Sequence, residues 1–144
     1  MRSIHILWPV LGQVLLTVGV YVLLAVRKMR AVKDGKVDRK AAALDNRAWP
    51  AEVVKVSNNL ANQFEAPVLF YALCFALLAL DGGGGIALVL AWLFVASRLV
   101  HTTVHVGSNF VPHRFGLFVL GVLILLAMTL VAAWHLLGAT GTLG

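Results

Sequence analysis

The sequence predicts an all-α integral membrane protein that folds as a four-helix transmembrane bundle. Apolar residues make up 60% of the 144 residues and charged residues only 12%, well below the roughly 25% charged residues typical of soluble domains. Four apolar runs, at residues 4–26, 56–80, 86–106 and 115–137, are each long enough to cross roughly 30 Å of bilayer hydrocarbon. Little chain is left for a soluble domain, so we expect one domain over residues 1–144.

Basic residues gather in the first connector and predict the orientation of the bundle. Residues 27–49 hold eight Lys or Arg against three acidic residues, so the positive-inside rule makes this loop cytoplasmic. With four spans, both termini and the glycine-rich turn at 81–85 are then non-cytoplasmic. We expect a multi-pass protein, in the cell inner membrane if the source is prokaryotic. Because the net charge of +6 reflects this loop, it indicates contact with anionic lipid headgroups and no nucleic-acid partner.

The first helix is expected over about residues 4–30. Its apolar run is too long for a typical signal peptide core, so we interpret it as a retained span. Gln13 and Thr17 are four residues apart on one face, which suits a hydrogen bond to another helix. Arg27, Lys28 and Arg30 end the helix, and their simplest role is to extend toward the headgroups.

The second helix is expected over about residues 50–80. Pro50 suits its first turn, Asp45 is a candidate N-cap, and Pro67 predicts a kink just past Glu65. Before that proline, polar side chains recur every three or four positions and form one stripe: Glu52, Lys55, Asn59, Asn62 and Glu65. Cys74 lies in the apolar half and is expected in the core, since one cysteine cannot form an internal disulfide.

Glu65 is the first candidate functional residue, because a carboxylate at the membrane edge needs a charged partner or water. The alternative is that it only fixes helix packing through a salt bridge, for which Arg98 is the expected partner.

The third helix is expected over about 86–106 and the fourth over about 114–137. Arg98, His101 and His105 form a second polar stripe, in the cytoplasmic half of the third helix. The fourth helix is almost wholly apolar and carries small residues suited to close packing, so it is expected to be scaffold. Two helices therefore present polar stripes at the same depth.

Two other kinds of site fit this pattern less well. His101 and His105 have the spacing of two metal ligands, with His113 or Glu65 as a third. The adjacent Arg98 repels a cation, however, so we expect no metal. Nucleophilic hydrolysis is excluded because Cys74 is deep in an apolar run and no Ser-His-Asp arrangement is present.

The stripes predict a cytoplasm-facing cavity at the membrane edge. Its expected residues are Asn58, Asn59, Asn62 and Glu65, with Arg98, His101 and His105, and a rim of Arg27, Arg30 and Arg114. Such a cavity suits a small zwitterionic, peptide-like ligand, with a lipophilic second substrate arriving from the bilayer. A proton or ion pathway through the same residues is the alternative.

The sequence resembles the MAPEG superfamily, the membrane-associated proteins in eicosanoid and glutathione metabolism. The resemblance covers nearly the whole chain and is carried by the basic first connector and three segments, NLANQFEAPVLFY, ASRLVHTTVH and PHRFG. Its most specific part is Asn62-x-x-Glu65 followed by Pro67, and then Arg98 one helix later.

The resemblance implies a homotrimer that binds glutathione between neighbouring subunits, as cosubstrate for a lipophilic electrophile. By position, Asn62 and Glu65 match glutathione contacts, Arg27 or Lys28 the basic end of helix one, and Arg98 the helix-three arginine. Arg114 matches the arginine that starts helix four. The chain departs from relatives at Asn58, where they have Arg, and at His101 and His105, where they have Tyr.

The resemblance therefore implies a membrane-bound glutathione transferase or peroxidase-like enzyme. We expect Arg114 to stabilise the thiolate, because its connector contains no acid to compensate its charge. His101 or His105 acting as a base is the alternative. A non-catalytic transporter-like or scaffold protein that retains the fold is the alternative to the enzyme.

Overall fold

The computed structural model describes residues 4–141, which form helices joined by short loops and contain no strand. The long elements are α1 (Leu7–Lys33), α3 (Ala51–Asn62), α4 (Ala66–Ala79), α5 (Gly85–Val106) and α6 (Val111–Gly141). The short ones are η1 (Ile4–Ile6), α2 (Arg39–Ala42) and η2 (Asn46–Ala48).

Four helical stretches are long and apolar enough to cross a membrane: Ile4–Lys33, Ala51–Ala79, Gly85–Val106 and Val111–Thr140. The predicted four-helix membrane fold is confirmed, and the homotrimer stays a prediction.

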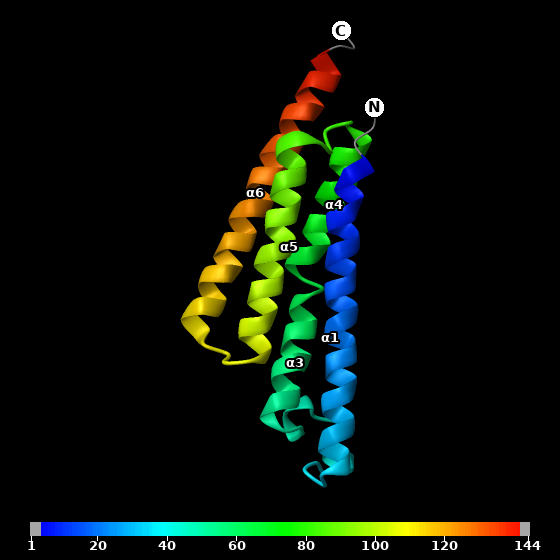
Figure 1. Cartoon of the computed structure of the whole chain (residues 1–144), viewed down its shortest axis with the longest axis vertical. Helices are drawn as coiled ribbons and strands as arrows, with labels where there is room; N and C mark the ends of the chain where they lie inside the picture. The colour runs from blue at the N-terminus through cyan, green and yellow to red at the C-terminus, as the bar shows by residue number, and fades with distance from the viewer. Residues whose placement is uncertain (1–3, 142–144) are drawn as a thin grey trace.

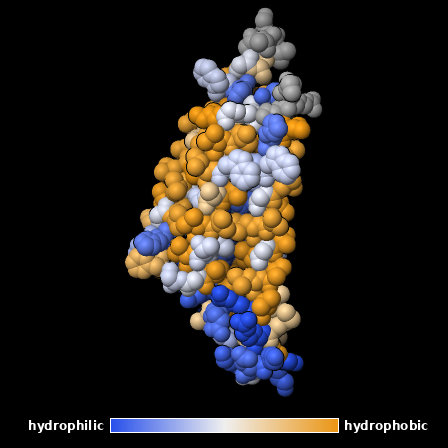
Figure 2. Space-filling view, viewed as in Figure 1, coloured by the Kyte–Doolittle hydropathy of each residue, from blue (hydrophilic) through white to orange (hydrophobic). Residues whose placement is uncertain are grey.

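The two ends of the described chain lie at the same end of the bundle, and the basic loop lies at the opposite end (Figure 1). Figure 2 shows a broad apolar surface along the bundle, with hydrophilic residues gathered at the loop end. Which end faces the cytoplasm stays a prediction. The predicted outer positions of residues 1–3 and 142–144 lie outside the described residues.

The second span is broken rather than continuous over residues 50–80. Between α3 and α4, Glu65 has φ −101° and ψ −99°, outside the helical region. A proline ring clashes with the carbonyl four residues earlier and removes one helical hydrogen bond, and for Pro67 that carbonyl belongs to Gln63. The interruption therefore lies at Gln63–Glu65, ahead of the proline, whereas the sequence predicted a kink past Glu65.

Other boundaries also differ from those predicted. Asp45 caps the short η2 turn through the backbone N–H of Arg47 at 2.8 Å, not the following helix, which begins after Pro50. The last helix begins at Val111, because Pro112 is well suited to a first helical turn. Arg114 consequently belongs to that first turn and not to the connector. α1 continues to Lys33, beyond the predicted end at 30.

Helix α5 lies at the centre of the bundle and packs on α1, α3, α4 and α6. The core between α4, α5 and α6 is apolar: Phe70 and Phe94 stack with ring centroids 4.6 Å apart, and Met128 and Leu77 are fully buried beside them. Cys74 is fully buried in this core, where the sequence predicted it. Polar contacts between helices lie farther along the bundle, at the level of the helix break and of α3.

Candidate functional site

A buried network of polar side chains links α1, α3 and α5 beside the helix break. Gln13 Nε2 donates to Gln63 Oε1 at 2.9 Å. Gln63 Nε2 in turn donates to Asn59 Oδ1 at 3.2 Å and to Thr102 Oγ1 at 3.1 Å. All four side chains are buried. Polar groups away from water must find partners within the protein, so this network ties three helices together.

Asn59 and Asn62 converge on His105. Their side-chain Nδ2 atoms lie 3.3 and 3.4 Å from His105 Nδ1. Because amide NH₂ groups only donate, Nδ1 is the acceptor and the neutral ring carries its proton on Nε2. The ring of His101 packs edge-on against His105, with centroids 5.6 Å apart. The structure thus brings four of the predicted site residues together.

Arg98 is buried near the end of α3 and forms no salt bridge with Glu65. Its Nη2 donates to the carbonyl oxygen of Asn62 at 3.5 Å, and its Nε has no partner within residues 4–141. The ion pairs in the described chain join loop residues: Asp34 with Lys36, and Asp45 with Arg47. The expected Glu65–Arg98 pair is wrong. The Glu65 side chain lies at the helix break and is exposed on the surface.

A polar cavity of about 240 Å³ opens between α3, α5 and the start of α6. It is lined by Asn62, His101, Val111, Arg114, Phe115 and Phe118. His101 Nδ1 and Arg114 Nε are buried and have no hydrogen-bond partner in the described part of the chain. The Asn62 amide and the Arg114 guanidinium give this lining its polar character, so the cavity suits a polar ligand or water.

Arg114 is half-buried at the edge of this cavity. Its Nη1 donates to Asn109 Oδ1 at 2.7 Å, and no acidic side chain of residues 4–141 forms an ion pair with it. The neutral amide orients the guanidinium and leaves its charge uncompensated. Such a group favours the ionised form of an acidic ligand group placed beside it.

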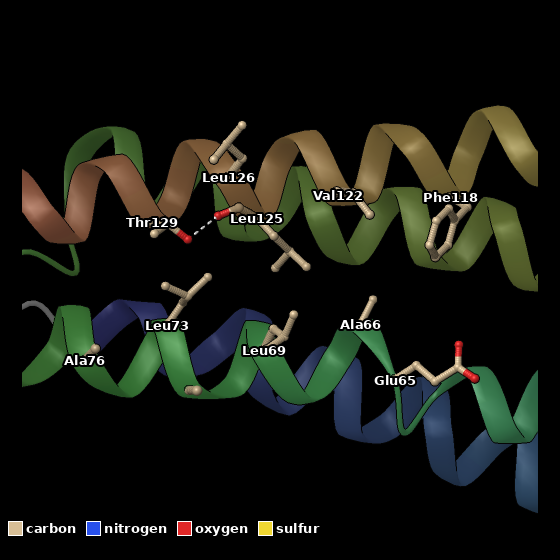
Figure 3. Close-up of a pocket in the computed structure, with 11 residues that line it drawn as sticks. Glu65, Ala66, Leu69, Leu73, Ala76, Phe118, Val122, Leu125, Leu126 and Thr129 are labelled. Carbon is tan, nitrogen blue, oxygen red and sulfur yellow. Dashed lines mark hydrogen bonds between the residues drawn. The ribbon is translucent and has the colours of Figure 1, made fainter.

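A long apolar groove lies between α4 and α6 (Figure 3). Its volume is about 710 Å³, Glu65 lines its end at the helix break, and Phe118 lines both the groove and the polar cavity. From Glu65 to Ala76 its wall extends roughly 16 Å at 1.5 Å per residue. The groove therefore suits an elongated lipophilic molecule with one end next to Arg114.

The basic end of α1 makes structural contacts. Arg27 Nη1 donates to the carbonyl oxygen of Glu52 at 2.8 Å, and Lys28 Nζ lies 4.8 Å from the centroid of the Trp49 ring. Arg30 is exposed. None of these three basic residues lines the polar cavity of this chain. Their expected contact with glutathione requires a neighbouring subunit and stays a prediction.

Asn58 is exposed and belongs to a second cavity, of about 430 Å³. The other residues that line it are Arg47, Trp49, Ala51, Val54, Lys55, His105 and Asn109. Because His105 also contacts Asn62, which lines the smaller cavity, the two cavities are neighbours. Within residues 4–141 no group of three His, Cys, Asp or Glu side chains is placed to hold a metal ion.

Sequence reasoning did not single out Gln63 or Asn109. Gln63 lies among other polar residues, so its position in the sequence did not distinguish it, although its side chain connects all three helices. Its partner Gln13, alone in an apolar run, was the available signal, because a buried amide in a membrane helix needs a partner on another helix. Asn109 gave no signal, since an asparagine between two helices usually serves the turn alone.

The model of the MAPEG family matches residues 6–134, which is most of the chain. No curated protein and no solved structure matches it significantly. The extent of the family match agrees with the four membrane helices and with the motifs around Asn62, Glu65 and Arg98. This multi-pass membrane protein therefore belongs to the MAPEG family.

Proposed function

We propose that the protein is a membrane-bound thiol transferase that uses glutathione as cosubstrate and acts on lipophilic electrophiles, or reduces lipid peroxides. Family membership supports a function in membrane glutathione or eicosanoid metabolism. The observation that carries the finer proposal is the position of Arg114. Its uncompensated guanidinium lines a polar cavity that shares Phe118 with a long apolar groove.

This arrangement can hold two substrates of opposite character. A peptide-like thiol would occupy the polar cavity, beside the Asn62 amide and the His101 ring. A lipophilic electrophile would lie in the apolar groove, with its reactive end near Phe118. Glu65, exposed at the end of the groove, is available to the ammonium group of the thiol cosubstrate.

Arg114 would act by stabilising the thiolate. A thiol with a pKa near 8.5 is only a few percent ionised at pH 7, and lowering that pKa by about two units requires roughly 2.7 kcal/mol. The thiol proton leaves to water or to a neighbouring imidazole. The thiolate sulfur then forms a bond to the electrophilic carbon, and the leaving group or the opened epoxide oxygen takes the electron pair. With a peroxide, two thiols become one disulfide while the peroxide becomes an alcohol and water.

In this proposal the protein is a homotrimer, which brings the basic end of α1 from one subunit toward the cavity of the next. That assembly would give Arg27, Lys28 and Arg30 their expected place as glutathione contacts. The basic loop then faces the cytoplasm, where glutathione is available, and both termini face the other side.

Substituting Arg114 tests the proposal directly. Arg114→Ala should remove the ultraviolet absorbance of glutathione thiolate bound to the protein and most of the conjugation of a model electrophile. Glutathione affinity, measured by isothermal titration, should stay within about tenfold, or 1.4 kcal/mol. Arg39→Ala is the matched control, because Arg39 is an exposed arginine of the basic loop that lines neither cavity.

Two results would contradict this assignment. If the thiolate persists in Arg114→Ala and disappears in His101→Ala or His105→Ala, a histidine base performs the step. If the wild-type protein binds no glutathione and conjugates no electrophile, the alternative of a non-catalytic transporter-like or scaffold protein replaces the enzyme.

A further inference from the structure

Asn109 holds the connector between α5 and α6 in a left-handed backbone conformation. Its φ is +55°, and in the described chain Asp81 is the other non-glycine residue with positive φ. Asparagine tolerates this conformation better than most residues. The backbone N–H of Asn109 donates to the carbonyl oxygen of Val104 at 2.7 Å, so the conformation also closes the end of α5. Residues held in such conformations are concentrated at functional sites.

The side chain of Asn109 connects this turn to Arg114. Its Oδ1 accepts from Arg114 Nη1 at 2.7 Å, while the backbone N–H of Arg114 donates to the Phe110 carbonyl oxygen at 3.1 Å. The main chain of Arg114 is thus held in the first turn of α6, and the hydrogen bond to Asn109 fixes the tip of its side chain. Asn109 lines the larger cavity and Arg114 the smaller, so their hydrogen bond lies between the two.

The neutral character of Asn109 matters because the titratable groups around the cavity include a single carboxylate. α5 contributes Arg98, His101 and His105, the first turn of α6 contributes His113, and the helix break contributes Glu65. Glu65 is the one carboxylate in this set, and its side chain is on the surface. An aspartate at position 109 would instead place a second carboxylate directly on Arg114.

We propose that Asn109 is a positioning residue that orients the Arg114 guanidinium toward the polar cavity without compensating its charge. The effect of this orientation on the thiolate of glutathione rests on the proposed function. The structural part of the inference, the fixed orientation of Arg114, does not depend on any substrate.

Two substitutions separate orientation from charge. Asn109→Gly preserves the left-handed backbone, which glycine adopts readily, and removes only the acceptor for Arg114. Asn109→Asp keeps an acceptor oxygen and adds a negative charge. Asp81→Gly is the matched control, because it relieves the same backbone conformation at φ +53° in a turn at the other end of the bundle.

The first measurement needs no substrate. The purified full chain in mild detergent is treated with phenylglyoxal, and the modification rate of Arg114 is followed by mass spectrometry of its peptide. Asn109→Gly should raise this rate about tenfold, since a hydrogen bond to a charged group is lost. Asn109→Asp and Asp81→Gly should leave it near the wild-type rate. An unchanged rate in Asn109→Gly overturns the inference, whatever the enzyme kinetics show.

The second measurement is the thiol pKa of bound glutathione, taken from the thiolate absorbance as a function of pH. Asn109→Asp should raise it by about one to three units, because a carboxylate now compensates the guanidinium. Asn109→Gly should lower kcat with KM little changed, as expected when an interaction made in the transition state is lost. If the thiol pKa in Asn109→Asp equals that of the wild-type protein, the absence of charge on Asn109 has no effect on the thiolate and this part of the inference is wrong.

These outcomes distinguish the inference from the proposed function. If the wild-type protein forms no thiolate but Arg114 reacts faster in Asn109→Gly, Asn109 orients Arg114 and the transferase proposal fails. If the wild-type thiolate forms and both Asn109 variants match wild type in both measurements, the transferase proposal holds and the positioning role is wrong.

Discussion

The hydrogen bond between Gln13 and Gln63 should contribute measurably to the stability of the bundle. It joins α1 to the helix break, and both side chains are fully buried. Leucine has a similar size and no polar group, so Gln13→Leu, Gln63→Leu and the double variant form a double-mutant cycle around this one bond. The cycle cancels effects of each substitution that do not depend on the partner residue.

The expected energies follow from the contacts of each residue. Gln63→Leu removes three hydrogen bonds and leaves the Gln13 amide, Asn59 Oδ1 and the Thr102 hydroxyl with one partner fewer. Interhelical hydrogen bonds in membrane proteins average about 0.6 kcal/mol, with a maximum near 1.7, so we expect a loss of roughly 2–4 kcal/mol for this variant. Gln13→Leu removes one bond and should cost about 1 kcal/mol. The coupling between the two positions should be about 0.6–1.7 kcal/mol.

Unfolding by sodium dodecyl sulfate in mixed micelles, followed by circular dichroism, gives the free energy of unfolding for each variant. Thr129→Val paired with Gln13→Leu serves as the control, because Thr129 bonds only within α6, to the Leu125 carbonyl oxygen. That pair should be additive. If Gln13→Leu and Gln63→Leu are also additive within about 0.3 kcal/mol, the buried bond contributes no coupling and our reasoning about the network is wrong.

Three further predictions follow from single contacts. Glu65→Gln should abolish glutathione binding in isothermal titration while the oligomer seen by crosslinking is retained; loss of the oligomer with binding intact would instead favour a packing role. Hydrogen bonds from the backbone and side chain of Arg47 lower the pKa of Asp45 below 3.8. The ionised carboxylate therefore stabilises the loop above that pH, and this stabilisation is lost as the pH falls through the lowered pKa. Proton titration of Asp45 by NMR should show this, and Arg47→Ala, which keeps the backbone N–H and removes the side-chain bond, should return the midpoint only part of the way to 3.8. Gly82→Ala should lower the melting temperature, because the added Cβ would lie 2.7 Å from the His135 ring, whereas in a His135→Ala background the same change should have little effect.

Hydropathy was enough to predict the four spans, because apolar run length is a property of the sequence alone. It could not predict the interruption at Gln63–Glu65. The polar residues before Pro67 have a helical period, which predicts an unbroken helix. The proline itself predicted only a kink just past Glu65. The structural effect appears four residues upstream, at the carbonyl that its ring would contact.

Sequence spacing also predicted which residues of one helix share a face, but not which helices supply their partners. Asn59, Asn62 and His105 were correctly grouped because they repeat on two stripes. Arg27 was grouped by its position at the end of a basic helix, and its hydrogen bond to a backbone carbonyl of α3 could not be predicted from spacing. Gln63 and Gln13 are 50 positions apart, and no periodicity links residues at that separation.

The break between α3 and α4 has an electrostatic consequence of its own. It creates two helix ends within a single span, and each helix end carries about half an elementary charge, negative at the C-terminus and positive at the N-terminus. The buried Arg98 guanidinium meets the negative end of α3 at the Asn62 carbonyl oxygen, so the helix macrodipole stabilises its positive charge. The same break gives the N-terminus of α4 a positive end at Glu65, so one interrupted span presents a negative helix end to its arginine and a positive one to its carboxylate.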